Sequence, residues 1–310
     1  MTSDLGLIEN ITTIIRPPYF YISGFTGIPH MEYYYVFLSL VYIISLIGNS
    51  FIMFVISMDR SLHSPKYIVV FNLALTDVCE TTALVPKLLD MFLFDRQFIS
   101  YNQCLANLFF ISIFLFMQSF NLTILSYDRL VAISDRCCLG VCFVNCFVTS
   151  LNLKLDFSIK INVHIFMSVV INSYFCDHGP LYRLAAPCCD VLPNIVLSYF
   201  IPCLVLYIPM VFIIASYICI IHALFTITLP KDRAIKTCTS HLILVAIFYL
   251  PINISYLFVS FIPSNIRIIN LSLTSVLPPM LNPIIYVLKT EEFKVSAKRL
   301  LKRVRNHIAP

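Results

Sequence analysis

The chain has 310 residues, of which 59% are hydrophobic and 12% are charged, with a mean hydropathy of +0.87 and a formal net charge of +5. A soluble domain carries about 25% charged residues, so this chain lacks the charge to cover a water-facing surface. The composition excludes a disordered tail, a collagen-like chain and an ordinary cytosolic enzyme. It also disfavours an outer-membrane barrel, whose alternating strands need many turns. Lipid is the predicted main solvent.

Long apolar segments recur along the chain, and a helix needs about 20 such residues to cross a bilayer. A weaker crossing at Cys137–Leu153 has only 17 residues. Together these segments predict an all-α membrane protein, a seven-transmembrane helix bundle whose fourth helix is atypical. The six clear segments are Tyr33–Ser57, Tyr67–Phe94, Cys104–Tyr127, Val191–Leu229, Thr237–Ile266 and Ile268–Leu288.

The distribution of basic residues predicts the orientation. With the N-terminus outside, fourteen Lys and Arg residues fall on the cytoplasmic side and seven on the other, as the positive-inside rule requires. We therefore expect an extracellular tail at 1–32, the bundle at 33–288 and a cytoplasmic segment at 289–310. The N-terminus lacks a basic region followed by an apolar run, so we expect the first helix to act as the insertion signal. Asn10 begins an Asn-Ile-Thr glycosylation acceptor on the outer side.

The segment after the last crossing has the pattern of an amphipathic helix. Its apolar residues recur at helical spacing, while basic residues occupy the other positions, which is typical of a helix on the inner leaflet. Membrane lipid is the expected partner of this face. The apolar set is Phe293, Ala297, Leu300, Leu301 and Val304, and the basic set is Lys294, Lys298, Lys302 and Arg305.

Polar residues lie in the middle or inner half of several predicted spans, where an unpaired polar group is costly. They are Asn49, Asp77, Ser119, Asn121 and Asn282. We therefore expect these residues to form a buried polar cluster. Two interpretations stay open: a fixed network that holds the helices in register, or a network that rearranges during signalling with a sodium ion bound at Asp77.

Three successive spans contain an internal proline, namely Pro209, Pro251 and Pro283. Each removes a backbone hydrogen bond and can kink its helix. The kinks serve packing alone or act as hinges in a moving bundle. The second interpretation favours a receptor or a transporter.

Several short motifs, in order and on the expected helices, resemble the odorant receptor family of rhodopsin-like G protein-coupled receptors. The resemblance covers about residues 20–134 and 172–305. The motifs are Leu62-His63-Ser64-Pro65-Lys66-Tyr67, Leu73-Ala74-Leu75-Thr76-Asp77, Ser126-Tyr127-Asp128-Arg129, Ser216-Tyr217, Lys236-Thr237-Cys238-Thr239-Ser240-His241-Leu242, Phe248-Tyr249 and Pro279-Met280-Leu281-Asn282-Pro283-Ile284-Ile285-Tyr286.

The resemblance implies roles for particular residues. Cys104 is expected to form a disulfide with Cys176. Arg129 is expected to hold the inactive state through Asp128 and to engage the G protein when released, while Tyr217 and Tyr286 move inward. The implied activation and coupling set also contains Asn49, Asp77, Asn282 and Pro283.

The family likeness also implies a ligand pocket in the outer halves of the third, fifth, sixth and seventh helices. Ile111 stands where amine receptors carry an Asp, which argues against amine ligands. The mainly apolar set suits small, weakly polar organic molecules, although ordinary helix packing explains each residue nearly as well. The expected lining residues are Ile111, Ser112, Leu115, Phe116, Leu206, Asn253, Tyr256, Leu257, Ser272 and Ser275.

The family pattern breaks after Ser134, and only 46 residues separate Arg129 from Cys176. The clean matches on both sides suggest a mistaken exon or a frame disruption in residues 135–171. The chain also has no Trp, a residue that the fourth helix of this family normally carries. If the written residues are real, the fourth helix is expected to be short or badly packed.

The resulting prediction is a plasma-membrane odorant receptor that activates a heterotrimeric G protein of the stimulatory class and raises cyclic AMP. No enzyme activity, cofactor or nucleic-acid partner is expected, because the His and Cys residues lack metal-ligand spacing with a carboxylate. Alternatives are a rhodopsin-like receptor for another small ligand, and a copy made non-functional by the disrupted fourth helix. A transporter or channel is the alternative from a different class.

Overall fold

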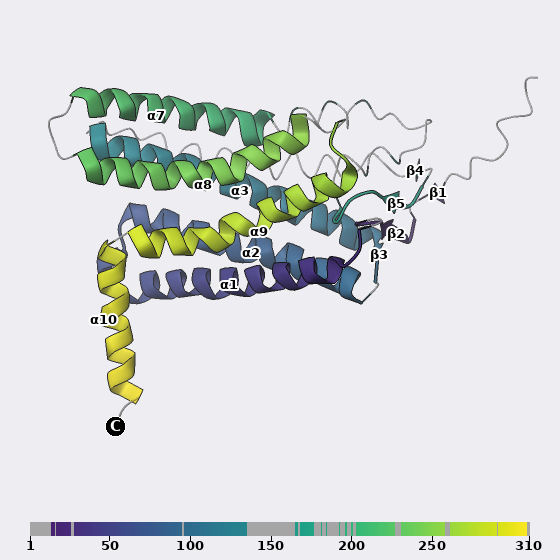
Figure 1. The fold of residues 1–310 in the computed structure, drawn as a ribbon, viewed down its shortest axis with the longest axis horizontal. Helices are drawn as coiled ribbons and strands as arrows, with labels where there is room; N and C mark the ends of the chain where they lie inside the picture. Colours follow the sequence, from purple (N-terminus) through teal and green to yellow (C-terminus); the bar gives the residue numbers. More distant parts are fainter. Residues whose placement is uncertain are drawn as a thin grey trace, which may run out of the picture.

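A computed structural model shows a bundle of long helices (Figure 1). It describes residues 14–15, 17–25, 28–94, 96–134, 165–166, 168–176, 203–226, 231–257, 261–289 and 291–308, together with single positions between 181 and 200. Within these residues, six helices are long and apolar enough to cross a membrane. The predicted fourth crossing at 137–153 lies outside the described residues, as does Asn10.

The spanning helices pack side by side, and one further helix runs across one end of the bundle (Figure 1). The spanning set is α1 (Met31–Met58), α2 (Pro65–Leu93), α3 (Tyr101–Ser134), α7 (Ile208–Thr226), α8 (Lys231–Leu257) and α9 (Ser264–Lys289). The crossing helix is α10 (Glu291–Ile308), which confirms the predicted helix after the last span. A 3₁₀ turn, η1 (Arg60–Leu62), joins α1 to α2.

The boundary between the last two spans differs from the prediction. Thr237–Ile266 was expected to form one span, but α8 begins earlier, at Lys231, and ends at Leu257, while α9 begins at Ser264. Apolar content alone hid the break, because Phe261 and Ile262 continue the hydrophobic pattern. Pro263 and Ser264 are typical helix-start residues, and the amide of Arg267 donates to the Pro263 carbonyl at 3.1 Å. The local start signal therefore overrides the apolar run.

Short strands form a cap at the end of the bundle opposite α10 (Figure 1). In one sheet, β2 (Tyr19–Ile22) lies between β3 (Phe98–Ser100), which is antiparallel to it, and β5 (Val170–Ile171), which is parallel. In a second sheet, β1 (Ile14–Ile15) pairs with β4 (Ile165–Phe166). The sequence did not predict these strands, because each is only two to four residues long and its partners are distant in the chain.

The disulfide implied by the family likeness is present in this cap. Cys104 at the start of α3 is bonded to Cys176, with 5.3 Å between the Cα atoms. Both cysteines are fully buried, in one apolar cluster with Phe20, Ile99 and Ile171. The bond therefore joins the first turn of α3 to the segment that follows β5.

Candidate functional site

The carboxylate of Asp77 is the centre of a buried polar network between α2, α3 and α9. Gln118 donates its amide to Oδ1 at 3.0 Å, and Asn282 donates to Oδ2 at 2.7 Å. All three side chains are less than 5% exposed. A buried carboxylate needs such donors, because burial without them is strongly unfavourable. The structure thus brings together Asp77 and Asn282, two residues of the expected activation set.

A second carboxyl group, that of Glu80, lies one helical turn from Asp77 and is also buried. Its Oε2 has no hydrogen-bond partner within the described part of the chain, and neither has the Oε1 of Gln118. Hard cations take oxygen ligands, so Asp77, Glu80 and Gln118 offer suitable chemistry for sodium. Both Asp77 oxygens already accept amide hydrogens, and an ion would compete with them. Sodium binding stays a prediction.

Asn49 holds α1 against α9 at a proline. Pro283 has no N–H, so it leaves the carbonyl four residues earlier, at Pro279, without its helical donor. Asn49 donates Nδ2 to that carbonyl at 2.7 Å. At the adjacent Gly48 the backbones approach so closely that an added Cβ would lie 2.9 Å from the Pro283 Cβ. The predicted polar residue and the predicted proline therefore act as a pair.

The same arrangement occurs at Pro209. It deprives the carbonyl of Val205 of its donor, and Val205 lies in a π-helical turn, η2 (Cys203–Tyr207). Ser119 of α3 donates its hydroxyl to this carbonyl. Since that hydrogen is committed, the Tyr249 hydroxyl donates to Ser119 Oγ at 2.8 Å. One buried serine thus joins α3, α7 and α8.

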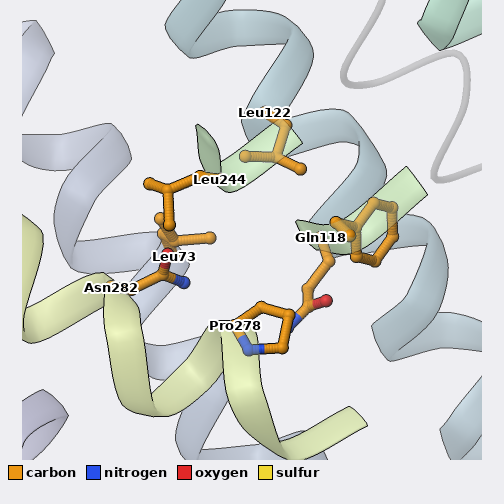
Figure 2. Close-up of a pocket in the computed structure, with 7 residues that line it drawn as sticks. Leu73, Gln118, Leu122, Leu244, Pro278 and Asn282 are labelled. Carbon is orange, nitrogen blue, oxygen red and sulfur yellow. The ribbon is translucent and has the colours of Figure 1, made fainter. Parts of the chain in front are cut away.

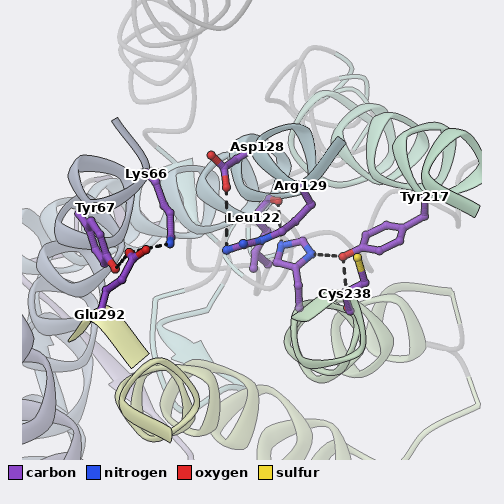
Figure 3. A network of polar contacts seen from close by, with 9 residues as sticks. Lys66, Tyr67, Leu122, Asp128, Arg129, Tyr217, Cys238 and Glu292 are labelled. Atoms are coloured by element: carbon purple, nitrogen blue, oxygen red, sulfur yellow. Dashed lines mark hydrogen bonds and ion pairs between the residues drawn. The ribbon is translucent and has the colours of Figure 1, made fainter. Parts of the chain in front are cut away.

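The end of the bundle that α10 crosses, called the inner end below, contains Arg129, which lies between two hydrogen-bonded groups (Figure 3). Its guanidinium is 3.9 Å from the Asp128 carboxylate, the ion pair expected from the family likeness, and the pair is partly exposed. The buried Nε of Arg129 has no hydrogen-bond partner within the described part of the chain. Among the described residues, one long ion pair therefore holds the arginine.

His241 connects three helices beside Arg129. Its Nε2 lies 3.1 Å from the Leu122 carbonyl of α3, and its Nδ1 lies 2.7 Å from the Tyr217 hydroxyl of α7. A carbonyl only accepts, so Nε2 carries the hydrogen and Tyr217 donates to Nδ1. The 5% exposed imidazole fixes α8 against α3 and α7.

Helix α10 is attached to the inner ends of α1 and α2 by two carboxylates. Glu292 accepts from the Tyr67 hydroxyl at 2.6 Å and lies 3.5 Å from the Lys66 ammonium. Asp59 lies 3.5 Å from the Arg299 guanidinium. The Tyr67 hydrogen bond and the Lys66 charge lower the pKa of Glu292, and hydrogen bonds from Ser61 lower that of Asp59. We call this set of contacts the α10 clasp.

Nine of the ten expected ligand residues have described side chains, and these nine do not form one lining. Phe116 and Leu206 share an apolar cluster, against which Leu115 packs. Ile111 packs against a different cluster, formed by α1, α2 and α9. Ser272 is bonded to the Tyr34 hydroxyl of α1 at 2.6 Å, and Leu257 is 64% exposed at the end of α8. These last two positions depart from the expected pocket.

The remaining polar candidates bond to the backbone of their own helices. Ser112 donates to Leu108, Asn253 donates to Tyr249, and Ser275 donates to Leu271. Such local bonds are the usual way in which hydroxyl and amide groups are satisfied inside a helix. The side chains of Tyr256 and Tyr286 lie outside the described residues.

A small void lies deeper than the expected ligand residues, beside the Asp77 network (Figure 2). Gln118 and Asn282, both donors to Asp77, contribute to its wall, and none of the nine expected ligand residues with described side chains does. The lining comes from α2, α3, α8 and α9: Leu73, Gln118, Leu122, Leu244, Phe248, Pro278 and Asn282. Most of the lining is apolar, and its two polar residues, Gln118 and Asn282, associate the void with the network and not with the expected ligand pocket.

Sequence reasoning omitted several members of these networks from the expected site. Gln118 and Glu80 were not in the expected polar set, because neither belongs to a motif that distinguishes it. His241 was placed in a motif without a role. A usable signal did exist for two contacts, since Pro209 and Pro283 each specify the carbonyl four residues earlier that needs a new donor. The donor could not be identified from one sequence, because it comes from another helix.

Comparisons with known proteins identify a family and several relatives. Residues 38–304 match the family described as Olfactory receptor. The chain is 32% identical to Olfactory receptor 7E178 of Mus musculus, covering 95% of this chain and 92% of the relative. It is 31% identical to Olfactory receptor 8B8 of Mus musculus, covering 92% and 96%. Olfactory receptor 2AT4 of Homo sapiens is 29% identical, covering 92% and 93%.

The fold, the buried polar network and these relatives define the class as a G protein-coupled receptor, a multi-pass membrane protein and not an enzyme. Within that class, the chain belongs to the olfactory receptor family.

Proposed function

We propose that this chain is an odorant receptor that binds small, weakly polar organic molecules within the bundle and activates a stimulatory G protein, raising cyclic AMP. Membership of the olfactory receptor family supports the ligand class. The N-terminus lies outside the cell and the C-terminus inside, as the distribution of basic residues indicates. The bundle extends over 33–288, between the extracellular tail and the cytoplasmic segment.

The observation that carries the coupling mechanism is the arrangement around Arg129. One long ion pair holds its guanidinium, while His241 and Tyr217 fix the neighbouring ends of α7 and α8 through two neutral hydrogen bonds. A ligand that binds the open state more tightly shifts the population toward it. Opening the inner end of α8 away from α3 breaks the His241–Leu122 hydrogen bond, while the Tyr249–Ser119 hydrogen bond lies farther along the two helices. Arg129 then becomes accessible to the G protein.

The basic face of α10 is the proposed contact with inner-leaflet lipid. Lys298 and Lys302 are exposed, while Phe293, Ala297 and Leu300 are buried against α1 and α2. An exposed basic face on a helix that crosses the inner end of the bundle favours anionic headgroups. The clasp leaves these lysines free to meet the membrane surface.

The test is a cell assay with an epitope-tagged chain and a panel of volatile alcohols, aldehydes, ketones and esters. We expect at least one member to raise cyclic AMP, and a sensor of stimulatory G protein dissociation to respond in parallel. Arg129→Ala is expected to abolish both responses while surface staining is kept. Arg60→Ala, an exposed arginine at the same end, is the matched control and should respond normally.

Two results would contradict the proposal. One is a full response from Arg129→Ala, which would remove the arginine from the mechanism. The other is surface-expressed receptor that dissociates a different class of G protein in response to the panel, which would remove the stimulatory assignment. Forskolin in the same cells shows that the cyclic AMP readout works.

A further inference from the structure

The strand β2, near the N-terminus, is the middle strand of the three-stranded sheet in the outer cap. The amide of Ile22 donates to the Gln97 carbonyl at 2.9 Å, and the amide of Tyr21 donates to the Val169 carbonyl at 2.8 Å. Gln97 directly precedes β3, between α2 and α3, and Val169 directly precedes β5. β2 therefore connects the segment before α3 with the segment that contains β5, although β3 and β5 do not pair with each other.

The inner face of β2 is part of the core. Phe20 and Ile22 are both completely buried. They share a cluster with Met91 at the end of α2, Leu108 of α3 and the Cys104–Cys176 disulfide. Tyr19 and Tyr21 alternate with them and are exposed and half-buried, respectively. A strand with one fully buried face is fixed in register, so β2 has a defined position over the ends of α2 and α3.

The backbone that follows β2 holds the segment that follows β5. The amide of Ser23 donates to the Ile171 carbonyl and that of Gly24 to the Ser173 carbonyl, each at 3.1 Å. On the other side, Arg267 of α9 donates to the Asn172 carbonyl at 3.1 Å. Residues 171–173 are thus fixed from two directions, immediately before the chain turns toward the bundle.

The next two residues enter the bundle. Tyr174 is 2% exposed and lies in one cluster with Tyr35 of α1, Leu88 of α2 and Ile268 of α9. Phe175 packs against the same cluster, as does Ile111 of α3. The two aromatic rings contact each other edge to face, with 4.6 Å between their centroids. Two large rings therefore close the outer end of the bundle on the side of Ile111.

We propose that β2 is a strap that closes the outer end of the ligand site by holding Tyr174 and Phe175 in place. The inference rests on the proposed function only in that the closed space is the proposed odorant site. Phe20 and Ile22 are positioning residues, since they act through Ile171 and the segment after it. The strap makes the ligand site depend on residues outside the spanning helices.

The first test asks whether β2 occupies this position in the membrane. Tyr21 is paired with Val170 across the sheet, so Tyr21→Cys with Val170→Cys should form a disulfide on mild oxidation, detected as a linked peptide by mass spectrometry. The matched control is Phe98→Cys with Val170→Cys. Its residues flank β2 and are about two strand spacings apart, roughly 10 Å, which exceeds disulfide reach. Linkage of the control pair but not the test pair would overturn the arrangement.

The second test measures closure through a cysteine at Ile111. In live cells, Ile111→Cys is labelled with a charged maleimide, and the chain without this substitution supplies the background. Adding Phe20→Ala should raise the labelling rate about tenfold or more, because truncating a buried Phe costs more than the energy of a tenfold change. The Tyr21–Val170 disulfide should lower the rate. Adding Tyr19→Ala, at a residue that is 58% exposed, should leave it unchanged.

Two further variants separate closure from general disorder. Phe94→Cys, at a residue that is 68% exposed outside the strap, should label at one rate with or without Phe20→Ala. Phe20→Leu should restore most of the protection at Ile111→Cys. Equal rates at Ile111→Cys with and without Phe20→Ala would overturn the strap, and so would a parallel rise at Phe94→Cys. Neither measurement needs an agonist or a G protein, so failure of the proposed function would not affect them.

Discussion

The inner ends of the two halves of the bundle are held together by different chemistry. In the α1–α2–α10 half, two carboxylates pair with Lys66 and Arg299, and Phe293 and Leu300 are buried beneath them. In the α3–α7–α8 half, one imidazole makes two neutral hydrogen bonds. Both halves bury apolar side chains, and in the second half these include Ile220, Cys238 and Leu244. The halves therefore differ in their polar contacts, which are charged pairs in the first and neutral hydrogen bonds worth about 1 kcal/mol each in the second.

In the proposed coupling mechanism, this difference makes the α8 half the one that moves. Arg129 lies between Glu292 of the α10 clasp and Tyr217, whose hydroxyl contacts His241 (Figure 3). In the proposed mechanism, displacement of α8 exposes Arg129 while α1, α2 and α10 stay in place. Pro283 and Pro209, whose unpaired carbonyls receive side-chain donors, are divided in the same way. Asn49 closes the seam between α1 and α9, whereas Ser119 links the π turn before α7 to Tyr249 of α8. The contact at Pro283 therefore joins α1 to α9, whereas the contact at Pro209 is linked to α8, the helix that is proposed to move.

The largest expected effect comes from forcing the fixed half apart at Gly48. Gly48→Val places a branched side chain where even a Cβ lies 2.9 Å from Pro283. Overpacking of this kind costs about 1–3 kcal/mol or more, and we expect surface delivery to be largely lost. Flow cytometry of the tagged receptor measures it. Ile47→Val, at the exposed neighbouring position, is the control. Normal delivery of Gly48→Val would show that α1 and α9 are not tightly packed at this contact.

Removing the donor at the same seam should have a somewhat smaller effect. Asn49→Ala leaves the Pro279 carbonyl without the donor that replaces the missing proline N–H, at a cost of about 1–3 kcal/mol. We expect a lower thermal stability of the purified receptor and unchanged basal signalling. Ser119→Ala removes the equivalent donor in the mobile half and should change basal signalling as well. Identical behaviour of the two variants would contradict the division into halves.

The next prediction weakens the mobile half alone. His241→Phe keeps a ring of similar size but removes both hydrogen bonds, so the closed state loses about 1–2 kcal/mol relative to an open state that lacks them. Basal cyclic AMP should rise by up to roughly tenfold. Leu242→Ala, at a 43% exposed neighbour, should leave it unchanged. Basal signalling of His241→Phe at or below the wild-type level would show that the two His241 hydrogen bonds do not stabilise the closed state.

The smallest effect is expected at the clasp. Its carboxylates have a lowered folded pKa, so their contribution to stability is present above the ordinary value, 4.5 for Glu292, and is lost as pH falls through the folded value. Glu292→Gln removes the charge at a cost below about 1 kcal/mol, because the pair is exposed. Thermal unfolding of purified receptor at pH 7 and pH 3 should show a smaller loss on acidification for Glu292→Gln than for wild type.

The spanning helices could be predicted from the sequence because each depends on its own apolar content. The sites could be predicted only in part, since their contacts join distant segments. Asp77 and Asn282 were expected in one network, but their partner Gln118 carries no distinguishing local signal. His241 was tied to a motif, yet its contacts with Leu122 and Tyr217 depend on helix packing. Ser272 turned toward Tyr34 because the rotation of α9, and not its polarity, decides which helix it meets.

The pairing of β2 with β5 has a consequence for how the receptor is made. Ser23 and Ile171 are separated by 148 positions, so β2 emerges from the ribosome long before its partner exists. The strand can pair with β3 once α2 has been made, but its other edge stays unpaired while α3 and the later segment are translated. Such non-local pairs are the slow contacts of a fold, because their closure entropy is not offset until the partner arrives. Completion of the cap is therefore a late step of biosynthesis, because one edge of β2 stays open until β5 has been made.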